Sequence, residues 1–267
     1  FVTADTVLSY LKLYADEFKV RDYIKFETEV IRVRPLNDEK WEVITRHIPT
    51  GEFETNNFDG VMVCIGFSQP FIPNFPGLTF YQGRQTHSHT YRTPNDFHGE
   101  KVLVIGGGPS GIEIAKEMGR KAEKVFWSNH TERTFRKKLN FDLPENVKEK
   151  PDLIRFTEKG GDFEDGTYEE FSAVLFATGY KFCFPFLSVE CGLSVEEGKN
   201  VRPLFKHCIN INHPTMAIIG LPFFALGFPL FDLQVRFFLK FFSEEKEILS
   251  KSKMMEDLIN DEKKRET

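Results

Sequence analysis

The sequence lacks the features that mark several common classes of protein. Its four cysteines include no Cys-x-x-Cys pair, which argues against a thiol redox motif or a zinc knuckle, so buried reduced thiols are expected. It has no excess of basic residues: the net charge of −5 argues against nucleic acid as a main partner, because phosphates need a basic surface. No charged and then apolar leader precedes Phe1, so a signal peptide is not visible.

Long apolar runs without interruption are also scarce. Residues 214–231 carry no charge and are about long enough to raise the question of a membrane span. Gly220, Pro222, Gly227 and Pro229 interrupt them, and proline breaks helix interiors, so we expect a strand, a loop and a helix start instead. With 40% hydrophobic and 28% charged residues, the chain is expected to form a packed globular protein of one large or two modest domains.

Apolar spacing in the first third of the chain predicts a helix followed by antiparallel strands. Residues 6–18 have helical spacing, with Asp5 as the expected N-cap. The continuous apolar run of residues 60–66 predicts a buried strand that ends at Gly66. Alternating runs typical of antiparallel strands, with a turn at Thr50-Gly51, lie at residues 24–26, 30–33, 41–45 and 53–55.

The rest of the chain alternates between buried strands and helices, which predicts an α/β fold with a parallel sheet. Residues 139–152 resemble a polar loop, and the charged tail from Ser243 is expected to be helical or frayed. The Asp165-Gly166 turn predicts a hairpin of residues 154–156 and 167–170. The expected strands are residues 102–105, 124–127, 173–177 and 216–219, and the expected helices are residues 112–122 and 230–242.

A glycine-rich turn is the strongest single motif. Residues 106–111 read G-x-G-x-x-G between a buried strand and an apolar-periodic helix, the context that a dinucleotide-binding turn needs. Gly106 permits the tight turn, Gly108 leaves room for a pyrophosphate, and Gly111 allows close packing of helix and strand. The first-turn amides that we expect to bind the anion belong to Ser110, Gly111, Ile112 and Glu113. A tight strand-to-helix turn without a ligand is the alternative.

The end of the next strand favours NADP over NAD. An NAD site usually has Asp or Glu there to hold the ribose 2′-OH. Here Ser128, Asn129 and His130 follow the strand, and Arg133 and Arg136 lie close behind. A hydroxyl and several cations suit a 2′-phosphate; the alternative is that the two arginines are solvated loop charges.

Three predicted strands end in glycine, at Gly66, Gly179 and Gly220. In open parallel sheets, ligands bind beyond the carboxyl ends of the strands. Glycine at such ends lets the backbone approach a flat ring or a pyrophosphate closely. We therefore expect all three glycines to lie near bound cofactors.

The segment from Tyr81 to Arg92, YQGRQTHSHTYR, resembles the fingerprint F-x-G-x-x-x-H-x-x-x-Y-[K/R] of flavin-containing monooxygenases. Tyr81 stands where Phe is usual, and Tyr91 stands where the related Baeyer–Villiger enzymes have Trp, which argues against that subgroup. Residues 176–180, FATGY, residues 63–77, and residues 214–221 with Leu233-Gln234 are also similar to family segments in the same order.

The resemblance implies a two-dinucleotide-binding-domain flavoprotein of the FAD/NAD(P)-binding Rossmann-like class. Its FAD-binding domain, residues 1–92 and 181–267, would be interrupted by a smaller NADPH-binding domain, residues 93–180. Cofactor contacts are implied for Val30 beside the adenine, for Thr178-Gly179 at the hinge, and for Gln234 facing the flavin ring. The fingerprint residues implied to shape the link between the domains are Gly83, His87, Tyr91 and Arg92. Loop packing and ordinary surface exposure are the alternatives for these residues.

The resemblance further implies NADPH- and FAD-dependent oxygenation of a nucleophilic nitrogen or sulfur of a small molecule by O2, through a C4a-hydroperoxyflavin. The cofactor carries this chemistry, so no catalytic side chain is expected. His87 and His89 lack a nearby third ligand, so no metal site is expected.

The family's first G-x-G-x-x-G turn, which binds FAD, is not among the 267 residues. If these residues are the whole molecule, we expect weak FAD binding and no turnover. A truncated, non-catalytic dinucleotide-binding protein therefore remains an alternative. Another NAD(P)H-dependent flavoprotein reductase is the second alternative, although the disulfide reductases need a redox-active cysteine pair. The substrate, the oligomeric state, and a cytoplasmic or endoplasmic-reticulum location are left open.

Overall fold

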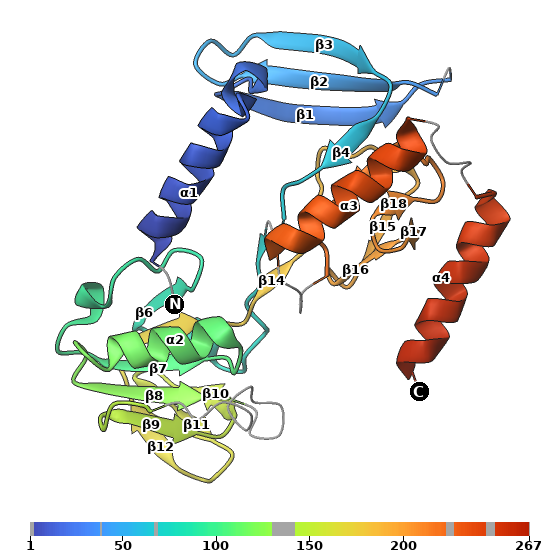
Figure 1. The fold of residues 1–267 in the computed structure, drawn as a ribbon. Coiled ribbons are helices and arrows are strands. Elements are labelled where there is room, and N and C mark those ends of the chain that lie inside the picture. The colour runs from blue at the N-terminus through green and yellow to red at the C-terminus, as the bar shows by residue number, and fades with distance from the viewer. Residues whose placement is uncertain are drawn as a thin grey trace. The chain divides into compact units, whose positions relative to one another are not determined.

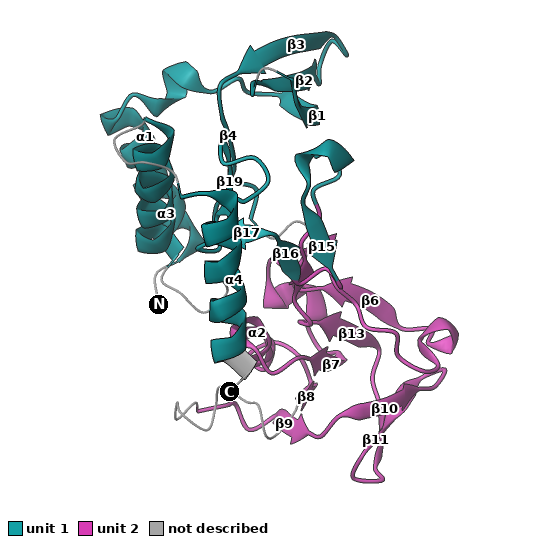
Figure 2. Ribbon diagram, turned by 90° about the vertical axis from the view of Figure 1, so that its right-hand side faces the viewer, with its two compact units in different colours: residues 1–66, 184–196, 200–267 teal, residues 67–183, 197–199 magenta. Residues whose placement is uncertain are grey.

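A computed structural model describes residues 3–37, 39–66, 69–129, 142–222, 227–243 and 249–266. The chain divides into two compact units (Figure 2). Unit 1 comprises Phe1–Gly66, Phe184–Glu196 and Asn200–Thr267, and unit 2 comprises Phe67–Cys183 and Glu197–Lys199. Unit 2 thus begins at residue 67 and not at the expected residue 93, because strand β6 (Arg84–His87) pairs with β13 (Ala173–Phe176) inside it.

Unit 2 is built on a five-stranded parallel sheet with the order β6-β13-β7-β8-β9 (Figure 1). The inner strands β7 (Lys101–Ile105), β8 (Lys124–Ser128) and β13 are almost wholly buried, as their apolar runs predict. Strand β9 (Val147–Lys150) lies within the stretch expected to be a polar loop. It is an edge strand with one buried residue, Val147, so it has no apolar run to reveal it.

The two faces of this sheet are covered differently. Helix α2 (Pro109–Met118) packs on one face, where its residues Ile112, Ala115 and Met118 form a core with sheet residues. Phenylalanines of a small antiparallel sheet, β10 (Leu153–Phe156), β11 (Gly160–Phe163) and β12 (Tyr168–Glu170), share a second core with sheet residues such as Phe126 and Phe176. The expected hairpin was wrong in its pairing, because the Asp165-Gly166 turn joins β11 to β12.

Shorter elements complete unit 2. Strand β5 (Gln69–Pro70) pairs in antiparallel fashion with β14 (Tyr180–Lys181). Two 3-10 helices, η2 (Leu78–Phe80) and η3 (Pro94–Phe97), flank β6 along the chain. The β5–β14 ribbon therefore joins the residues that precede the fingerprint to those that follow β13.

The residues of unit 1 that the structure describes form three sheets. Strands β1 (Thr28–Pro35), β2 (Trp41–His47) and β3 (Phe53–Phe58) form an antiparallel sheet, as expected, whereas residues 24–26 are not a strand. The second sheet has the order β17-β18-β19-β4, and its strands are β17 (Leu204–Phe205), β18 (Ile209–Asn210), β19 (Met216–Ile218) and β4 (Val61–Val63). The third is the pair β15 (Ser194–Glu196) and β16 (Asn200–Arg202), preceded by the 3-10 helix η5 (Val189–Cys191).

The described residues of unit 1 also include three α-helices and, besides η5, a second 3-10 helix. Helix α1 (Ala4–Glu17) begins two residues earlier than expected: its N-cap is Thr3, not Asp5, and the Thr3 side chain accepts from the Thr6 amide. The short η1 (Val20–Tyr23) follows it. Helices α3 (Gly227–Phe242) and α4 (Lys251–Glu266) contribute Phe238 and Met254 to a core with β18 and β19.

The cysteines differ in their exposure to solvent. The four cysteines all lie among the described residues and form no disulfide. Cys191 and Cys208 are buried as expected, and burial raises the pKa of the Cys208 thiol to about 12, but Cys64 is exposed. Within the described part of the chain, no helix combines the length and the apolar character that crossing a membrane requires.

Candidate functional site

The glycine-rich turn lies at the carboxyl end of β7, inside the parallel sheet of unit 2. From β7 the strands β8 and β9 extend to one side, and β13 and β6 extend to the other. The strand order therefore reverses between β7 and β13, which is where ligands bind in doubly wound sheets. Gly106 has φ of 133°, and a Cβ on it would lie 2.3 Å from the carbonyl oxygen of Ala177. Glycine is thus required where β7 and β13 diverge.

The start of α2 is packed directly against this turn. A Cβ on Gly111 would lie 2.0 Å from the carbonyl oxygen of Gly106. This position in the first turn of α2 therefore requires glycine. Pro109 occupies the first helical turn, where a missing N–H removes no helical hydrogen bond. The sequence-based roles of Gly106 and Gly111 therefore have a direct steric basis.

The first-turn amides of α2 differ in whether they already have a hydrogen-bond partner within the protein. The Ile112 amide already donates to Gly108 O at 3.2 Å, and the Ile112 side chain is buried in the core. Glu113 is exposed and lies one residue deeper in the helix. The first N–H groups of a helix have no partner within it. Of the four predicted amides, those of Ser110 and Gly111 are therefore best placed for an anion.

Gly108 provides the space that an anion would need. It is exposed, and a Cβ built on it has no heavy atom within 4 Å. It is also the N-cap of α2, and no side chain caps the helix there. The positive end of the helix dipole and the amides of the first turn face outward at such an end. The turn thus fits the pyrophosphate of a dinucleotide.

The polar side chains of Ser128 and Asn129 at the end of β8 already have hydrogen-bond partners within the protein. Ser128 is 2% exposed, and its hydroxyl donates to the carbonyl oxygen of Pro151 at 2.9 Å. The neighbouring Asn129 is 3% exposed and donates from Nδ2 to Glu149 Oε1 at 3.2 Å. His130, Arg133 and Arg136 lie outside the described residues. The contact of this strand end with a 2′-phosphate therefore stays a prediction.

Two fingerprint residues, Tyr81 and Gly83, contact each other. The Tyr81 hydroxyl donates to Phe171 O at 3.0 Å, and a Cβ on Gly83 would lie 2.1 Å from that hydroxyl oxygen. Burial raises the pKa of Tyr81, which keeps its proton. The change from the usual Phe to Tyr thus adds a hydrogen bond, and Gly83 leaves room for it.

His87 is buried at the end of β6, beside the β5–β14 ribbon. Its Nδ1 accepts from the His89 amide at 3.1 Å, and its Nε2 has no partner with hydrogen-bond geometry. Burial lowers the pKa of His87, and the carbonyl groups of Gly179 and Phe71 partly oppose this lowering. The Thr178 hydroxyl donates to Phe71 O, and the Phe71 amide donates to Gly179 O. His87, Thr178 and Gly179 therefore meet around the segment at Phe71. The hinge role that the resemblance implies for Thr178 and Gly179 stays a prediction.

Tyr91 and Arg92 complete the fingerprint on the α2 side of the sheet. The Tyr91 hydroxyl donates to Glu117 Oε2 on α2 at 3.0 Å, and its ring packs against the core beneath that helix. Arg92 Nη1 donates to the carbonyl oxygens of His89 and Tyr91 at 2.8 Å each. In unit 2, Tyr91 thus connects the segment that follows β6 to helix α2.

In unit 1, Gly66 and Gly220 follow the parallel strands β4 and β19, so both lie beyond the same edge of that sheet. Their φ angles are 62° and 87°, in the left-handed region that favours glycine. Gln234 of α3 is 5% exposed, and its Oε1 accepts from the Gly220 amide at 2.9 Å. Gln234 is therefore buried and holds the turn at Gly220.

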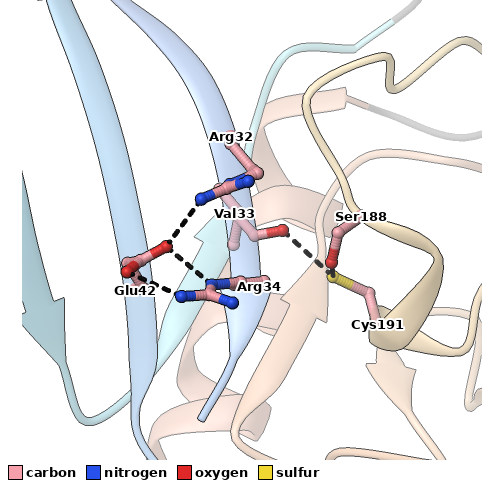
Figure 3. A network of polar contacts seen from close by, with 6 residues as sticks. All are labelled: Arg32, Val33, Arg34, Glu42, Ser188 and Cys191. Carbon is pink, nitrogen blue, oxygen red and sulfur yellow. Dashed lines mark hydrogen bonds and ion pairs between the residues drawn. The ribbon is translucent and has the colours of Figure 1, made fainter.

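Val30, the expected neighbour of the adenine, lies on β1 and is 40% exposed. The register of β1 shifts between Val30 and Arg32. Beyond the shift, Glu42 of β2 accepts from Arg34 and Arg32, while the carbonyl oxygen of Val33 accepts from the Cys191 thiol at 3.4 Å (Figure 3). These contacts join β1 to β2 along one edge and to Cys191 along the other, whereas the side chain of Val30 is accessible.

Sequence reasoning missed one residue that contacts the glycine turn. Trp127 of β8 donates from Nε1 to Gly106 O at 2.8 Å. Its place one residue before Ser128 was the available signal. As for metals, the residues placed in the structure contain no cluster of three or more His, Cys, Asp or Glu side chains suited to an ion.

A parallel sheet with a glycine-rich turn at its switch point defines a dinucleotide-binding α/β protein. The model of the flavin-binding monooxygenase-like family matches residues 1–135 and 131–267, so the chain belongs to this family. FAD and NADP(H) are the cofactors that go with this membership.

Individual relatives agree with this membership. The chain is 34% identical over 258 residues to flavin-containing monooxygenase FMO GS-OX3 of Arabidopsis thaliana, covering 94% of this chain and 55% of the relative. It is 34% identical over 259 residues to senecionine N-oxygenase of Tyria jacobaeae, covering 96% and 56%. The chain thus spans about half the length of these relatives.

Solved structures show the same fold. The structure of S-allyl-L-cysteine S-oxygenase from Allium sativum aligns with a TM-score of 0.89 at 29% identity, covering 98% of this chain and 60% of that one. The Tmm structure from Pelagibacter sp. strain HTCC7211 aligns with a TM-score of 0.85 at 25% identity, covering 96% and 57%. The chain therefore has the α/β flavoprotein monooxygenase fold with two dinucleotide-binding domains.

Proposed function

We propose that the protein containing this chain is an NADPH- and FAD-dependent monooxygenase that oxygenates a nucleophilic nitrogen or sulfur of a small molecule. The observation that carries the proposal is the glycine turn at the switch point of unit 2, where Gly108 is open and the α2 terminus is uncapped. The names of the relatives, an N-oxygenase and an S-oxygenase, support the substrate class.

Each unit has its own part in the proposal. Unit 2 holds NADP(H), with the pyrophosphate at Gly108, Ser110 and Gly111, and with Ser128, His130 and Arg133 on the adenosine side. Unit 1 contributes to the FAD site through the backbone turns at Gly66 and Gly220 and through Val30, while Gln234 fixes the second turn. Bound reduced flavin supplies the oxygenating chemistry, and the hydroperoxide route implied by the resemblance belongs to this proposal.

The chain's own residues would position and shield the cofactors rather than take part in bond making. Closed, water-poor surroundings protect reactive intermediates of this kind. We accordingly assign no catalytic side chain.

The test uses the gene's longest reading frame that includes these residues. The expected result is a yellow protein that oxidises NADPH and oxygenates a methimazole-like sulfur compound, with Gly108→Ala strongly impaired. A protein that holds flavin at full occupancy and shows no NADPH-dependent oxygenation would contradict the proposal.

A second candidate is a non-catalytic dinucleotide-binding protein. It is favoured by one observation: the 267 residues contain a single G-x-G-x-x-G turn, and that turn lies in unit 2. Both candidates predict that residues 1–267 alone hold little flavin, so the absorption spectrum of the purified product of the longest reading frame separates them. The non-catalytic candidate predicts NADP+ binding without bound flavin in that product, whereas the monooxygenase predicts bound flavin.

A further inference from the structure

The glycine turn of unit 2 is held by an indole as well as by close packing. Trp127 is fully buried at the end of β8, and its Nε1–H donates to the carbonyl oxygen of Gly106 at 2.8 Å. The Gly106 amide donates to the carbonyl oxygen of Ser128, one residue further along β8, at 2.9 Å. The N–H and the C=O of Gly106 are therefore both bonded to β8.

This contact matters because the turn is intrinsically flexible. Residues 106–108 are three consecutive glycines, and glycine loses more conformational freedom on ordering than any other residue. A Cβ on Gly108 would meet no atom within 4 Å, so side-chain packing does not restrict this residue, although its carbonyl oxygen accepts from the Ile112 amide of α2. The turn is therefore ordered by α2 at its end and by Gly106 at its start.

Fixing the Gly106 carbonyl also sets the direction of the next amide. The peptide bond is planar and trans, so the Gly107 N–H points opposite to the Gly106 C=O. With that oxygen held by Trp127, the Gly107 N–H is directed away from the indole. The contact therefore orders the backbone that leads to Gly108 and to the first amides of α2.

We propose that Trp127 is a positioning residue for dinucleotide binding. Its indole N–H holds the triglycine turn in the conformation that receives the pyrophosphate. The proposal rests on the proposed function, because it takes NADP(H) as the ligand of this turn. Trp127 itself is fully buried, so the proposal assigns it no direct contact with the ligand.

The chain provides a matched control. Its second tryptophan, Trp41, is 1% exposed and donates from Nε1 to Thr215 Oγ1 at 2.9 Å in unit 1. Trp127→Phe and Trp41→Phe thus remove the same buried donor from different units. Comparing them separates an effect on the turn from a general loss of packing.

The experiment measures NADP+ affinity of the full 267-residue chain by titration calorimetry, with thermal unfolding recorded for each variant. Trp127→Phe should raise the Kd for NADP+ by about tenfold, the factor that corresponds to one buried hydrogen bond. Trp41→Phe should leave that Kd within about twofold of wild type, because its hydrogen bond lies in the other unit. The Kd for 2′-AMP, which has no pyrophosphate, should not change in either variant.

A second variant keeps the shape of the side chain. In the Trp41→Phe background, tryptophan at position 127 is replaced biosynthetically by β-(3-benzothienyl)alanine, which has sulfur in place of the indole N–H. It should weaken NADP+ binding as Trp127→Phe does, with little change in packing. This variant decides the matter if Trp127→Phe does not fold.

Several results would overturn the proposal. NADP+ binding of wild-type strength in the benzothienyl variant would show that the indole N–H is not needed. Equal losses in Trp41→Phe, or equal losses of 2′-AMP affinity, would show a general destabilisation. If wild-type chain itself does not bind NADP+, the proposed function of this turn fails, whereas binding unaffected by Trp127 variants removes this inference alone.

Discussion

At the scale of single residues, the glycine turn uses three glycines for three physical reasons. Gly106 adopts a positive φ beside Ala177, Gly111 makes a close approach to a carbonyl oxygen, and Gly108 leaves open space. The first two requirements are internal to the protein, and the third concerns a ligand. The glycines should therefore differ in whether substitution affects stability or binding.

Gly111→Ala should lower the free energy of unfolding by about 2 kcal/mol or more, because its methyl group would lie against a backbone carbonyl that cannot move away. Urea denaturation of the full chain measures this change. Gly108→Ala is the control and should unfold as wild type does, since the added methyl meets nothing. Equal stability of the two variants would contradict the packing described for α2.

His87 should make stability depend on pH. Burial lowers its pKa below the usual 6.5, so below that pH the unfolded chain binds a proton that the folded chain resists. The free energy of unfolding should fall as the pH drops below about 6.5, by at most about 1.4 kcal/mol per pH unit from this group. His87→Gln should flatten this slope in denaturation curves between pH 7 and pH 5. His98→Gln, at an exposed histidine that does not contribute to the shift of His87, is the control, and an unchanged slope in His87→Gln would refute the assignment.

At the scale of elements, the fingerprint residues connect several elements of unit 2 through side-chain contacts. Tyr81 bonds to Phe171, His87 lies beside the β5–β14 ribbon, and Tyr91 bonds to Glu117 on α2. Each residue joins a different element to the segment around β6. The structural alternative of loop packing accounts for these contacts, and an additional role in linking the two cofactor domains remains a prediction.

Helix α3 has a comparable role in unit 1. Gln234→Leu would leave the buried Gly220 amide without an acceptor, so the free energy of unfolding should fall by about 1–3 kcal/mol. Thermal or urea unfolding measures this loss. Leu233→Ala, at a neighbouring position that is 64% exposed, should have little effect. A Gln234→Leu variant as stable as wild type would show that the Gly220 amide has another partner.

The predictability of elements from sequence followed burial. The strands β7, β8 and β13 are buried on both faces, and their apolar runs identified them. Strand β9 buries Val147 alone, so its sequence predicts a polar loop instead of a strand. The steric role of Gly111 could be predicted because its close approach to Gly106 is local to the turn. The contact of Gly106 with Ala177 could not, and neither could those of Trp127 and Gln234, because each joins a turn to a residue outside the local sequence pattern.

At the scale of the whole molecule, the two units differ in what the 267 residues supply. Unit 2 contains a complete glycine turn with the strand and helix that flank it, whereas unit 1 has no second G-x-G-x-x-G sequence. The proposed assignment of unit 2 to NADP(H) and of unit 1 to FAD therefore predicts unequal binding of the two cofactors.

Purified residues 1–267 should carry little FAD. Without a second glycine turn, the diphosphate of FAD lacks the helix-terminus amides that usually hold it. Absorption near the flavin bands, measured after gel filtration with added FAD, checks this expectation. A full complement of tightly bound flavin would contradict it and would show that unit 1 binds FAD without such a turn.

Titration calorimetry of the 267-residue chain with NADP+ tests the central claim most directly, which is that the open turn at Gly108 receives a dinucleotide. Wild-type chain should bind NADP+ at one site. Gly108→Ala, with unchanged thermal unfolding, should bind it at least about tenfold more weakly because its methyl group occupies the space of the pyrophosphate. A folded wild-type chain that takes up no NADP+, or a Gly108→Ala variant that binds it equally well, would contradict the account.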